Sequence, residues 1–379
     1  MTSKELLTAL QLAGGKVNSN SEFIKSIENT KGVFDQDFIK TYLKPEYKRL
    51  PTNFQSSHFY DIIEESFLGL KETVAKGNIK FKDYEILSCD IPTFGTVDFK
   101  EFNAFVETTD TDSVIVFNEG LLMFIQRLKQ IYTLELWIRS KKKMTEEMKK
   151  LLTLNFFDIM LSFHLFSNAY YAIPLDWCNI EDLSDIDSAE KLYELESPFD
   201  EFISDLDYMF FDSDIGLSTY LWIAAHEYSH IVLGHLKNNN GTSKLHLNGI
   251  EVDKINLNKK QELDADLLGA IITFESDSSL FSEDGIYFAL ACMLLSSMEN
   301  KETPDISYPS VKERIKNIFS NIQSYVDYPI HNQRHIDVVF SRKYQDFRKM
   351  LRKIDEDNMF FSSIDEMQHY IYKIYPLEK

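Results

Sequence analysis

Two histidines four positions apart, inside an otherwise apolar segment, constrain this chain more than any other feature of its sequence. Residues 226–230 read His-Glu-Tyr-Ser-His, and apolar residues stand on both sides of them. Positions four apart lie on the same face of an α-helix, so both imidazoles can bind one metal ion. The apolar flanks predict a buried helix, which Gly234 would end as a C′ glycine. Candidates for its N-cap are Asp212, Ser213 and Asp214.

Glu227 completes the motif as a candidate catalytic residue. Beside a metal-bound water, a glutamate carboxylate can act as a general base. A motif this short also arises by chance. The alternative is a buried helix whose histidines and glutamate are satisfied by neighbouring polar groups. The apolar surroundings of the motif, and the carboxylates that follow it, favour the metal site.

A third protein ligand is expected, because catalytic zinc usually has three protein ligands and one open position. One class of such sites uses a histidine ten residues after the first, but that position is Leu236 here. His235 lies nine residues after His226, about half a turn away at ~100° per residue, so we expect it beside the ligands or in a structural role. Glu262 is the better candidate for the third ligand.

Glu262 belongs to a second predicted helix, Lys259–Phe274. Asn258 is the expected N-cap, with Gln261 as its capping-box partner. Asp266 lies four residues after Glu262 and therefore on the same face, where its carboxylate can accept the free N–H of a ligating histidine. The alternative is a solvated acidic helix face, which is common in an acidic chain.

The two segments together resemble the signature of the gluzincin metallopeptidases. Residues 226–235 and 262–266 are similar to the pattern HExxHxxxGH followed by ExxAD, which the CAAX-protease/HtpX-type, ImmA/IrrE-type and Lit-type phage-exclusion peptidases share. The resemblance covers roughly residues 114–318, with a long insertion after Arg127. It implies a zincin-like fold, bound Zn²⁺ and cleavage of peptide bonds. The HtpX-type families are membrane proteins, which this chain is not expected to be.

Two more segments carry the resemblance. Residues 308–315 are similar to an HPxxxxRI helix start, although Tyr308 stands where the families have histidine. The resemblance makes Tyr308 the first candidate, and Arg314 the second, for the donor that stabilises an oxyanion or contacts the substrate. Residues 112–122 resemble a strand followed by a Gly-Leu-Leu helix. In gluzincins such an edge strand aligns the substrate backbone, and the alternative is an ordinary strand–helix junction.

These residues predict a zinc-dependent endopeptidase that acts on an intracellular protein. His226, His230 and Glu262 would bind Zn²⁺, which lowers the pKa of a water molecule, and Glu227 would take its proton and pass it to the leaving amine. Two alternatives stay open. One is a zinc-site protein that does not cut and serves as a sensor or binding module. The other is a latent protease that awaits a trigger, as in phage defence.

Charge and composition limit the setting in which this chain can act. Its 379 residues carry a net charge of −20, which argues against nucleic-acid binding because that needs basic patches. The N-terminus lacks the basic start and apolar core of a signal peptide, and the apolar run Ile286–Met298 is shorter than the ~20 residues of a membrane span. The three cysteines show no disulfide framework. We expect a cytoplasmic protein without membrane or nucleic-acid partners, of open oligomeric state.

The expected fold class is α+β, mostly α, because glycine and proline are sparse and long amphipathic runs are frequent. A zincin-like core, with a small sheet flanking the active-site helix, would lie between helical N- and C-terminal regions. The expected parts are a helical region at 1–80, the zincin-like domain at 81–325 with an insertion at about 128–212, and C-terminal helices at 326–379. Strands are expected at Tyr84–Cys89, Phe102–Glu107 and Ser113–Phe117, separated by breaks that include Gly95. The acidic segment Glu181–Asp214 is expected to be a loop.

Overall fold

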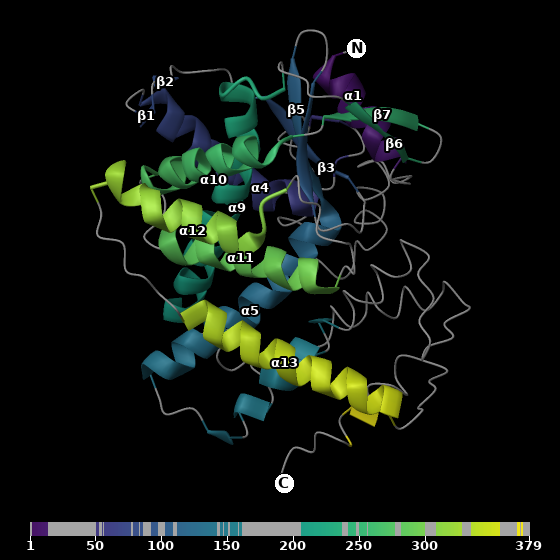
Figure 1. The fold of residues 1–379 in the computed structure, drawn as a ribbon, viewed down its shortest axis with the longest axis vertical. Coiled ribbons are helices and arrows are strands. Elements are labelled where there is room, and N and C mark those ends of the chain that lie inside the picture. The colour runs from purple at the N-terminus through teal and green to yellow at the C-terminus, as the bar shows by residue number, and fades with distance from the viewer. Residues whose placement is uncertain are drawn as a thin grey trace, which may run out of the picture. The chain divides into compact units, whose positions relative to one another are not determined.

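The predicted fold class, α+β and mostly α, is confirmed by a computed structural model, in which helices predominate around a small three-stranded sheet (Figure 1). The residues that the structure describes are 2–13, 51–52, 55, 57–76, 79–82, 84–85, 92–97, 103–108, 112–141, 145–146, 148–150, 152–157, 159–160, 206–236, 242–247, 250–255, 257–276, 282–299, 308–327, 335–356, 370–371 and 373. The elements are α1 (Ser3–Ala13), α4 (Ser57–Ala75), β1 (Lys80–Phe81), β2 (Tyr84–Glu85), β3 (Thr93–Val97), β4 (Ala104–Thr108), β5 (Ser113–Asn118), α5 (Glu119–Lys141), α9 (Leu206–Val232), β6 (Thr242–Leu247), β7 (Ile250–Ile255), α10 (Lys259–Phe274), α11 (Ser282–Glu299), α12 (Val311–Asn321), the short 3-10 helix η2 (Ile322–Ser324) and α13 (His335–Glu356).

The chain divides into two compact units. The first comprises residues 1–122, 217–282 and 304–330, and the second comprises residues 123–216, 283–303 and 331–379. In the second unit, Tyr132 of α5 stacks on Phe288 of α11, and Lys343 of α13 forms a buried ion pair with Glu135. None of the helices in the described part of the chain combines the length and apolar character that a bilayer crossing requires.

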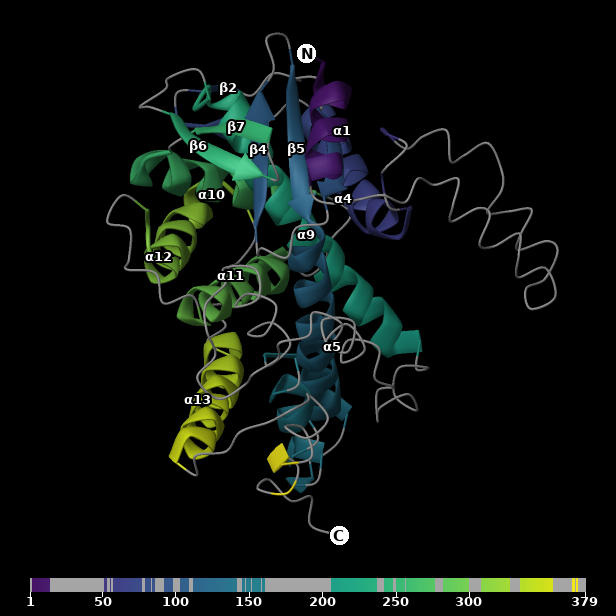
Figure 2. The same ribbon diagram turned by 90° about the vertical axis from the view of Figure 1, so that its right-hand side faces the viewer.

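The sheet of the first unit has strand order β3-β5-β4, with β3 parallel and β4 antiparallel to β5. Alternate side chains of a strand point to opposite faces, so Val97, Val114 and Val116 pack with α1, which lies alongside β5 in both views (Figures 1 and 2). Phe94 and Phe117 point to the other face, where both meet Phe67 of α4. The helix α4 also contacts α10, so the sheet is tied to the helix that carries Glu262.

Strand β3 was not expected, because Gly95 was interpreted as a break between strands. The structure places Gly95 inside β3, paired with Val116. A Cβ atom at this position would lie 2.6 Å from Leu7 Cδ2 and 2.7 Å from Gln55 Oε1. Glycine in a strand often marks such a close approach rather than a turn. The predicted strand Ser113–Phe117 is confirmed as β5, and residues 104–107 of the predicted strand Phe102–Glu107 lie in β4. Of Tyr84–Cys89, only β2 is within the described residues.

The predicted start of the motif helix was wrong, and its predicted end is confirmed. Helix α9 begins at Leu206, so the three residues assigned to its N-cap and the end of the expected acidic loop lie inside the helix; residues 181–205 lie outside the described part. Asp and Ser are also compatible with exposed helical positions, and the buried Ile215 continues the apolar face. Gly234 follows the helix with φ +67°, the left-handed conformation of a C′ glycine.

Helix α10 begins and ends where the sequence predicted. The side chain of Asn258 accepts hydrogen bonds from the backbone N–H groups of Lys260 and Gln261, and the side chain of Gln261 accepts one from the backbone N–H of Asn258. This is the predicted capping box. Because it determines where the first turn begins, it also determines which face of the helix carries Glu262 and Asp266.

Helix α10 lies close to the backbone of α9 at Gly269. A Cβ atom there would lie 2.9 Å from the backbone nitrogen of His226 and 3.1 Å from its Cα. Backbone atoms cannot move aside as a side chain can, so this glycine lets the two helices bring their metal-site residues together. The contact therefore belongs to the construction of the site.

Gly269→Ala is expected to lower the free energy of unfolding by about 1–3 kcal/mol, the usual cost of overpacking, and to weaken metal binding. The change is measured by urea denaturation and by competition with a chelator. Gly216→Ala in α9 is the matched control, because the atoms nearest to its Cβ would all belong to the flexible Lys129 side chain, whose Nζ lies at 2.9 Å. Both substitutions gain helix propensity. Equal stability of the two variants would contradict the role of Gly269.

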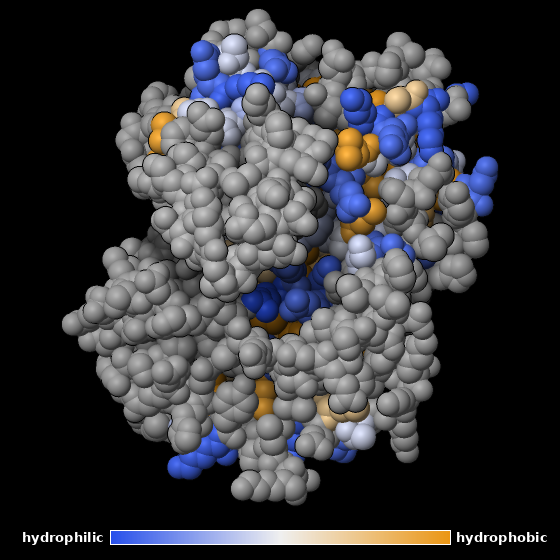
Figure 3. Space-filling model, turned by 180° about the vertical axis from the view of Figure 1, so that it is seen from behind, coloured by the Kyte–Doolittle hydropathy of each residue, from blue (hydrophilic) through white to orange (hydrophobic). Residues whose placement is uncertain are grey.

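The described residues expose few large hydrophobic side chains. In the space-filling view from behind, hydrophobic residues of the described part reach the surface in small separate patches among hydrophilic ones (Figure 3). Among the described residues, the exposed large hydrophobic side chains are Leu12, Leu68 and Tyr308. The first two lie on α1 and α4, whereas Tyr308 lies beside the predicted site.

Candidate metal centre

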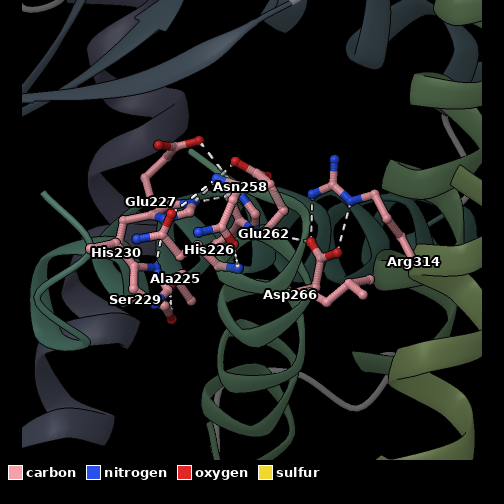
Figure 4. Close-up of polar contacts among 12 residues, drawn as sticks. Ala225, His226, Glu227, Ser229, His230, Asn258, Glu262, Asp266 and Arg314 are labelled. Carbon is pink, nitrogen blue, oxygen red and sulfur yellow. Dashed lines mark hydrogen bonds and ion pairs between the residues drawn. The ribbon is translucent and has the colours of Figure 1, made fainter. Parts of the chain in front are cut away.

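The two histidines of the motif lie on one face of α9, as their spacing predicted. Nε2 of His226 lies 3.2 Å from Nε2 of His230, and the two residues are 7% and 1% exposed. The hydroxyl of Ser229 donates to the Ala225 carbonyl at 2.6 Å, so this polar group is satisfied within the helix (Figure 4). Both imidazoles turn Nε2 toward the same point.

Glu262 on α10 offers the third candidate ligand atom. Its Oε2 lies 3.5 Å from Nε2 of His226, and its Oε1 lies 3.8 Å from Nε2 of His230. The carboxylate is 4% exposed, and the three ligand atoms lie within 4.8 Å of one another (Figure 4). Two imidazole nitrogens and one carboxylate oxygen, all buried, form a donor set that can hold a divalent metal ion.

Glu227 lies beside this group rather than within it. Its Oε1 is 4.0 Å from Nε2 of His226, and the residue is 8% exposed. Burial raises the pKa of Glu227 to about 8, and the negative charge of Glu262 acts in the same direction. A carboxylate that takes up a proton near neutral pH is suited to accept and return one during a reaction.

Asp266 lies behind His226, on the face of α10 that its spacing predicted. Its Oδ1 lies 3.0 Å from Nδ1 of His226. The same carboxylate accepts two hydrogen bonds from Arg314, from Nε at 2.8 Å and from Nη2 at 2.5 Å (Figure 4). The guanidinium also lies 5.9 Å from the Trp222 ring, and the Trp222 indole N–H donates to the Asp266 carbonyl at 3.4 Å. Asp266 is therefore charged, enclosed and immobilised.

Asp266→Asn is expected to weaken metal binding by about 10–100-fold, because the charged acceptor behind His226 is lost. It is also expected to lower the free energy of unfolding by about 3–5 kcal/mol, since the 6% exposed Arg314 loses its counter-charge. Chelator competition and urea denaturation measure the two effects. Asp346→Asn is the control, because its pair with Lys349 is exposed and should contribute little. Unchanged metal affinity in Asp266→Asn would contradict the role.

His235 lies beside His230, on the side away from Glu262. The chain leaves the helix at Gly234. The N–H of His235 donates to the carbonyl of His230 at 3.0 Å, and the N–H of Gly234 donates to the carbonyl of Ile231 at 3.1 Å. These two bonds form a Schellman motif. The side chain is 8% exposed, and its Nδ1 lies 3.0 Å from Nδ1 of His230. The angle of ~100° per residue does not apply to His235, because this residue lies beyond the end of α9.

Asp264 points away from the centre, as its spacing on α10 implies. It forms an ion pair at 2.5 Å with Lys82, which follows β1 and has a left-handed φ of 53°. The sequence offered no signal for this contact, since 182 positions separate the two residues. Trp222, by contrast, stands four residues before His226 and shares its face of α9. Helical spacing would therefore have predicted its contact with the site.

Tyr308 and Arg314 differ in how they meet the centre. Tyr308 precedes α12 and is 40% exposed, but burial raises the pKa of its hydroxyl, as do the negative charges of Glu262 and Glu227. The structure thus brings this hydroxyl to the candidate site. Arg314 lies in the first turn of α12, which begins at a capping box of Ser310 and Glu313. Its contacts are those with Asp266 and Trp222 described above.

Without a bound metal, the pKa values of the three candidate ligands lie far from their ordinary values. Burial alone would lower the pKa of His226, but the carboxylates of Asp266 and Glu262 raise it to about 10. Burial and the neighbouring His226 lower the pKa of His230 to about 3. Burial alone would raise the pKa of Glu262, but His226 and His230 lower it to about 2. The metal-free centre at neutral pH thus contains a protonated His226 paired with carboxylates.

Metal binding should therefore compete with a proton on His226. The raised pKa stabilises the metal-free fold fully below pH 6.5, and this contribution is lost as the pH rises through about 10. A metal ion needs the neutral imidazole, so zinc affinity is expected to rise by about tenfold per pH unit between pH 6.5 and 8.5. Chelator competition at several pH values measures it. A pH-independent affinity would show that His226 is neutral before the metal binds.

Comparison with known proteins finds a family model that matches the segment containing this site. Residues 198–332 match the family model described as Peptidase U49. No curated protein and no solved structure matches the chain. The matched segment includes both histidines of the motif, Glu262, Asp266 and Arg314. Over the part that carries its buried His-His-Glu group, this chain is therefore similar to a family of peptidases.

Proposed function

We propose that this chain is a zinc-dependent endopeptidase that hydrolyses peptide bonds of an intracellular protein. The observation that carries the proposal is the convergence of His226, His230 and Glu262, all buried, in a segment similar to a peptidase family. A general base, Glu227, stands next to them. A binding module without chemistry would not require that carboxylate.

The donor set fits zinc. Tetrahedral Zn²⁺ with bonds of about 2.0–2.1 Å holds its ligand atoms roughly 3.3 Å apart. The two Nε2 atoms lie 3.2 Å apart, Oε2 of Glu262 lies 3.5 Å from Nε2 of His226, and the other oxygen, Oε1, lies 3.8 Å from Nε2 of His230. With one ligand atom taken from each residue, the three atoms lie within 4.8 Å of one another. Two histidines and one glutamate are also a known ligand set of catalytic zinc, which leaves one position for water.

Bound zinc supplies a Lewis acid that polarises a carbonyl and lowers the pKa of a water molecule. Glu227 takes a proton from the attacking water as the new carbon–oxygen bond forms, and delivers a proton to the amine as the carbon–nitrogen bond breaks. Its buried position keeps bulk water from this proton. Tyr308 places a hydroxyl near Glu262 and Glu227, where it can donate to the oxyanion.

Arg314 acts through Asp266 in this proposal rather than on the substrate. Two of its nitrogens donate to the Asp266 carboxylate, which in turn faces Nδ1 of His226. The guanidinium keeps Asp266 ionised, because burial alone would raise the pKa of that carboxyl and Arg314 lowers it. An ionised acceptor fixes the His226 ring and increases its basicity toward a metal.

The test compares new protein N-termini in cells that express the wild type or Glu227→Gln. We expect termini that occur only with the wild type, and their sequences would name the substrate and the cleavage site. Zinc content of the two purified proteins is the control, and it should be equal. Identical sets of termini, with zinc bound to both proteins, would refute constitutive proteolysis and favour a zinc-site protein that does not cut.

A further inference from the structure

His235 has a contact that the mechanism above does not use. Both histidines of the motif direct Nε2 toward Glu262, so their Nδ1 atoms face outward. Nδ1 of His226 meets a carboxylate, that of Asp266, at 3.0 Å. Nδ1 of His230 instead meets another imidazole nitrogen, Nδ1 of His235, also at 3.0 Å. The Nδ1 atoms of the two candidate ligand histidines therefore face different groups, a carboxylate and an imidazole.

The contact with His235 permits one arrangement of protons when His230 is a ligand. A ligating imidazole is neutral and uses the lone pair of Nε2, so its proton must reside on Nδ1. That N–H then donates to Nδ1 of His235, which must be the acceptor. Both residues are nearly fully buried, at 1% and 8% exposure, so bulk water does not replace the acceptor easily.

The backbone conformation at the end of α9 positions His235 for this contact. The Schellman motif returns the chain at Gly234, and the N–H of His235 bonds to the carbonyl of His230 itself. One residue pair is thus joined twice, through the main chain and through the rings. The orientation of the His235 ring relative to His230 is set by the same turn that ends α9.

We propose that His235 is a positioning residue, whose Nδ1 accepts the proton of His230 Nδ1–H and so holds His230 in the tautomer and orientation that bind the metal. The proposal rests on the proposed function of the centre as a zinc site. An acceptor behind a ligating histidine orients its ring, and losing such an outer partner typically weakens metal binding by about 10–100-fold. Here a neutral imidazole takes the place that a carboxylate has behind His226.

The test measures the zinc affinity of the purified full-length chain by chelator competition. His235→Asn keeps an oxygen acceptor near the position of Nδ1, whereas His235→Leu fills similar space without an acceptor. We expect the Asn variant to bind zinc within a few-fold of the wild type and the Leu variant to bind about 10–100-fold more weakly. Equal zinc affinity of Leu and wild type, or equal loss in both variants, would overturn the proposal.

A second pair of variants tests the backbone's part and leaves His235 unchanged. Gly234 has φ +67°, and a Cβ atom there would meet nothing within 4 Å. Asn tolerates this left-handed conformation and Val does not, so any effect comes from the turn. We expect weaker zinc binding in Gly234→Val than in Gly234→Asn. The same affinity in both would contradict the link between the turn and His230.

These results separate the two proposals. A wild type that binds no zinc would overturn both. If zinc binds and His235→Leu weakens it, but no cleavage is found, the role of His235 stands and the proposed endopeptidase activity fails. If cleavage is found while His235→Leu binds zinc as the wild type does, only the inference about His235 fails.

Discussion

Glu227→Gln is expected to abolish cleavage while leaving zinc binding intact. The substitution keeps the size of the side chain and removes the group that accepts the proton, and loss of a general base typically lowers a rate by about 10²–10⁴-fold. Burial raises the pKa of Glu227 to about 8, so its carboxyl is largely protonated at pH 7 without metal. A neutral amide should then cost the metal-free fold little stability. Cleavage rate, zinc content and the urea midpoint measure the three expectations.

Asp264→Asn is the matched control for this variant. It also neutralises a carboxylate near the centre, but Asp264 faces Lys82 and not the ligands. Its cleavage rate should therefore remain close to that of the wild type. Full activity of Glu227→Gln would remove Glu227 from the mechanism, because no proton acceptor would then be missing. Loss of zinc in that variant would instead assign Glu227 to metal binding.

The second large effect is expected for Glu262→Ala, which should bind zinc far more weakly than the wild type. The variant lacks one of three ligand atoms, so the loss should exceed the roughly 10–100-fold that follows removal of an outer partner. It also leaves the buried positive charges of Arg314 and of a protonated His226 with one carboxylate fewer. Zinc binding is measured by chelator competition, together with the urea midpoint of the metal-free protein.

Asp264→Ala separates ligand loss from the general loss of a negative charge on α10. It lies two residues further along the same helix, and its partner Lys82 is 39% exposed. An exposed pair of this kind contributes little to stability, so both zinc affinity and the urea midpoint should change little. Equal zinc affinity in Glu262→Ala and Asp264→Ala would show that Glu262 is not a ligand.

Features that depend on nearby residues were predictable from the sequence. The capping box of Asn258 and Gln261, the common face of the two motif histidines and the C′ conformation of Gly234 all involve residues within four positions of one another. Hydrogen-bond geometry and helical periodicity determine such features locally. The same reasoning placed Asp266 on the face of Glu262.

Local reasoning failed where the decisive contact was distant in the chain. Gly95 was interpreted as a break, but its strand is formed by pairing with β5 and by the close approach of Leu7 from α1. The start of α9 was misplaced because polar residues that cap a helix also occur on its exposed side. His235 lies beside His230, as expected, but the helical wheel used to place it does not apply beyond Gly234.

The sequence by itself determined which residues can bind a metal and on which helix face each one lies, because helix spacing and capping are local. Only the tertiary structure decided that α9 and α10 meet closely enough, at Gly269, for the carboxylate of Glu262 to face both histidines. It also paired Arg314 with Asp266 and placed His235 behind His230. These contacts depend on how helices pack and turn, and residues that pattern rules treat separately become neighbours only when the core forms.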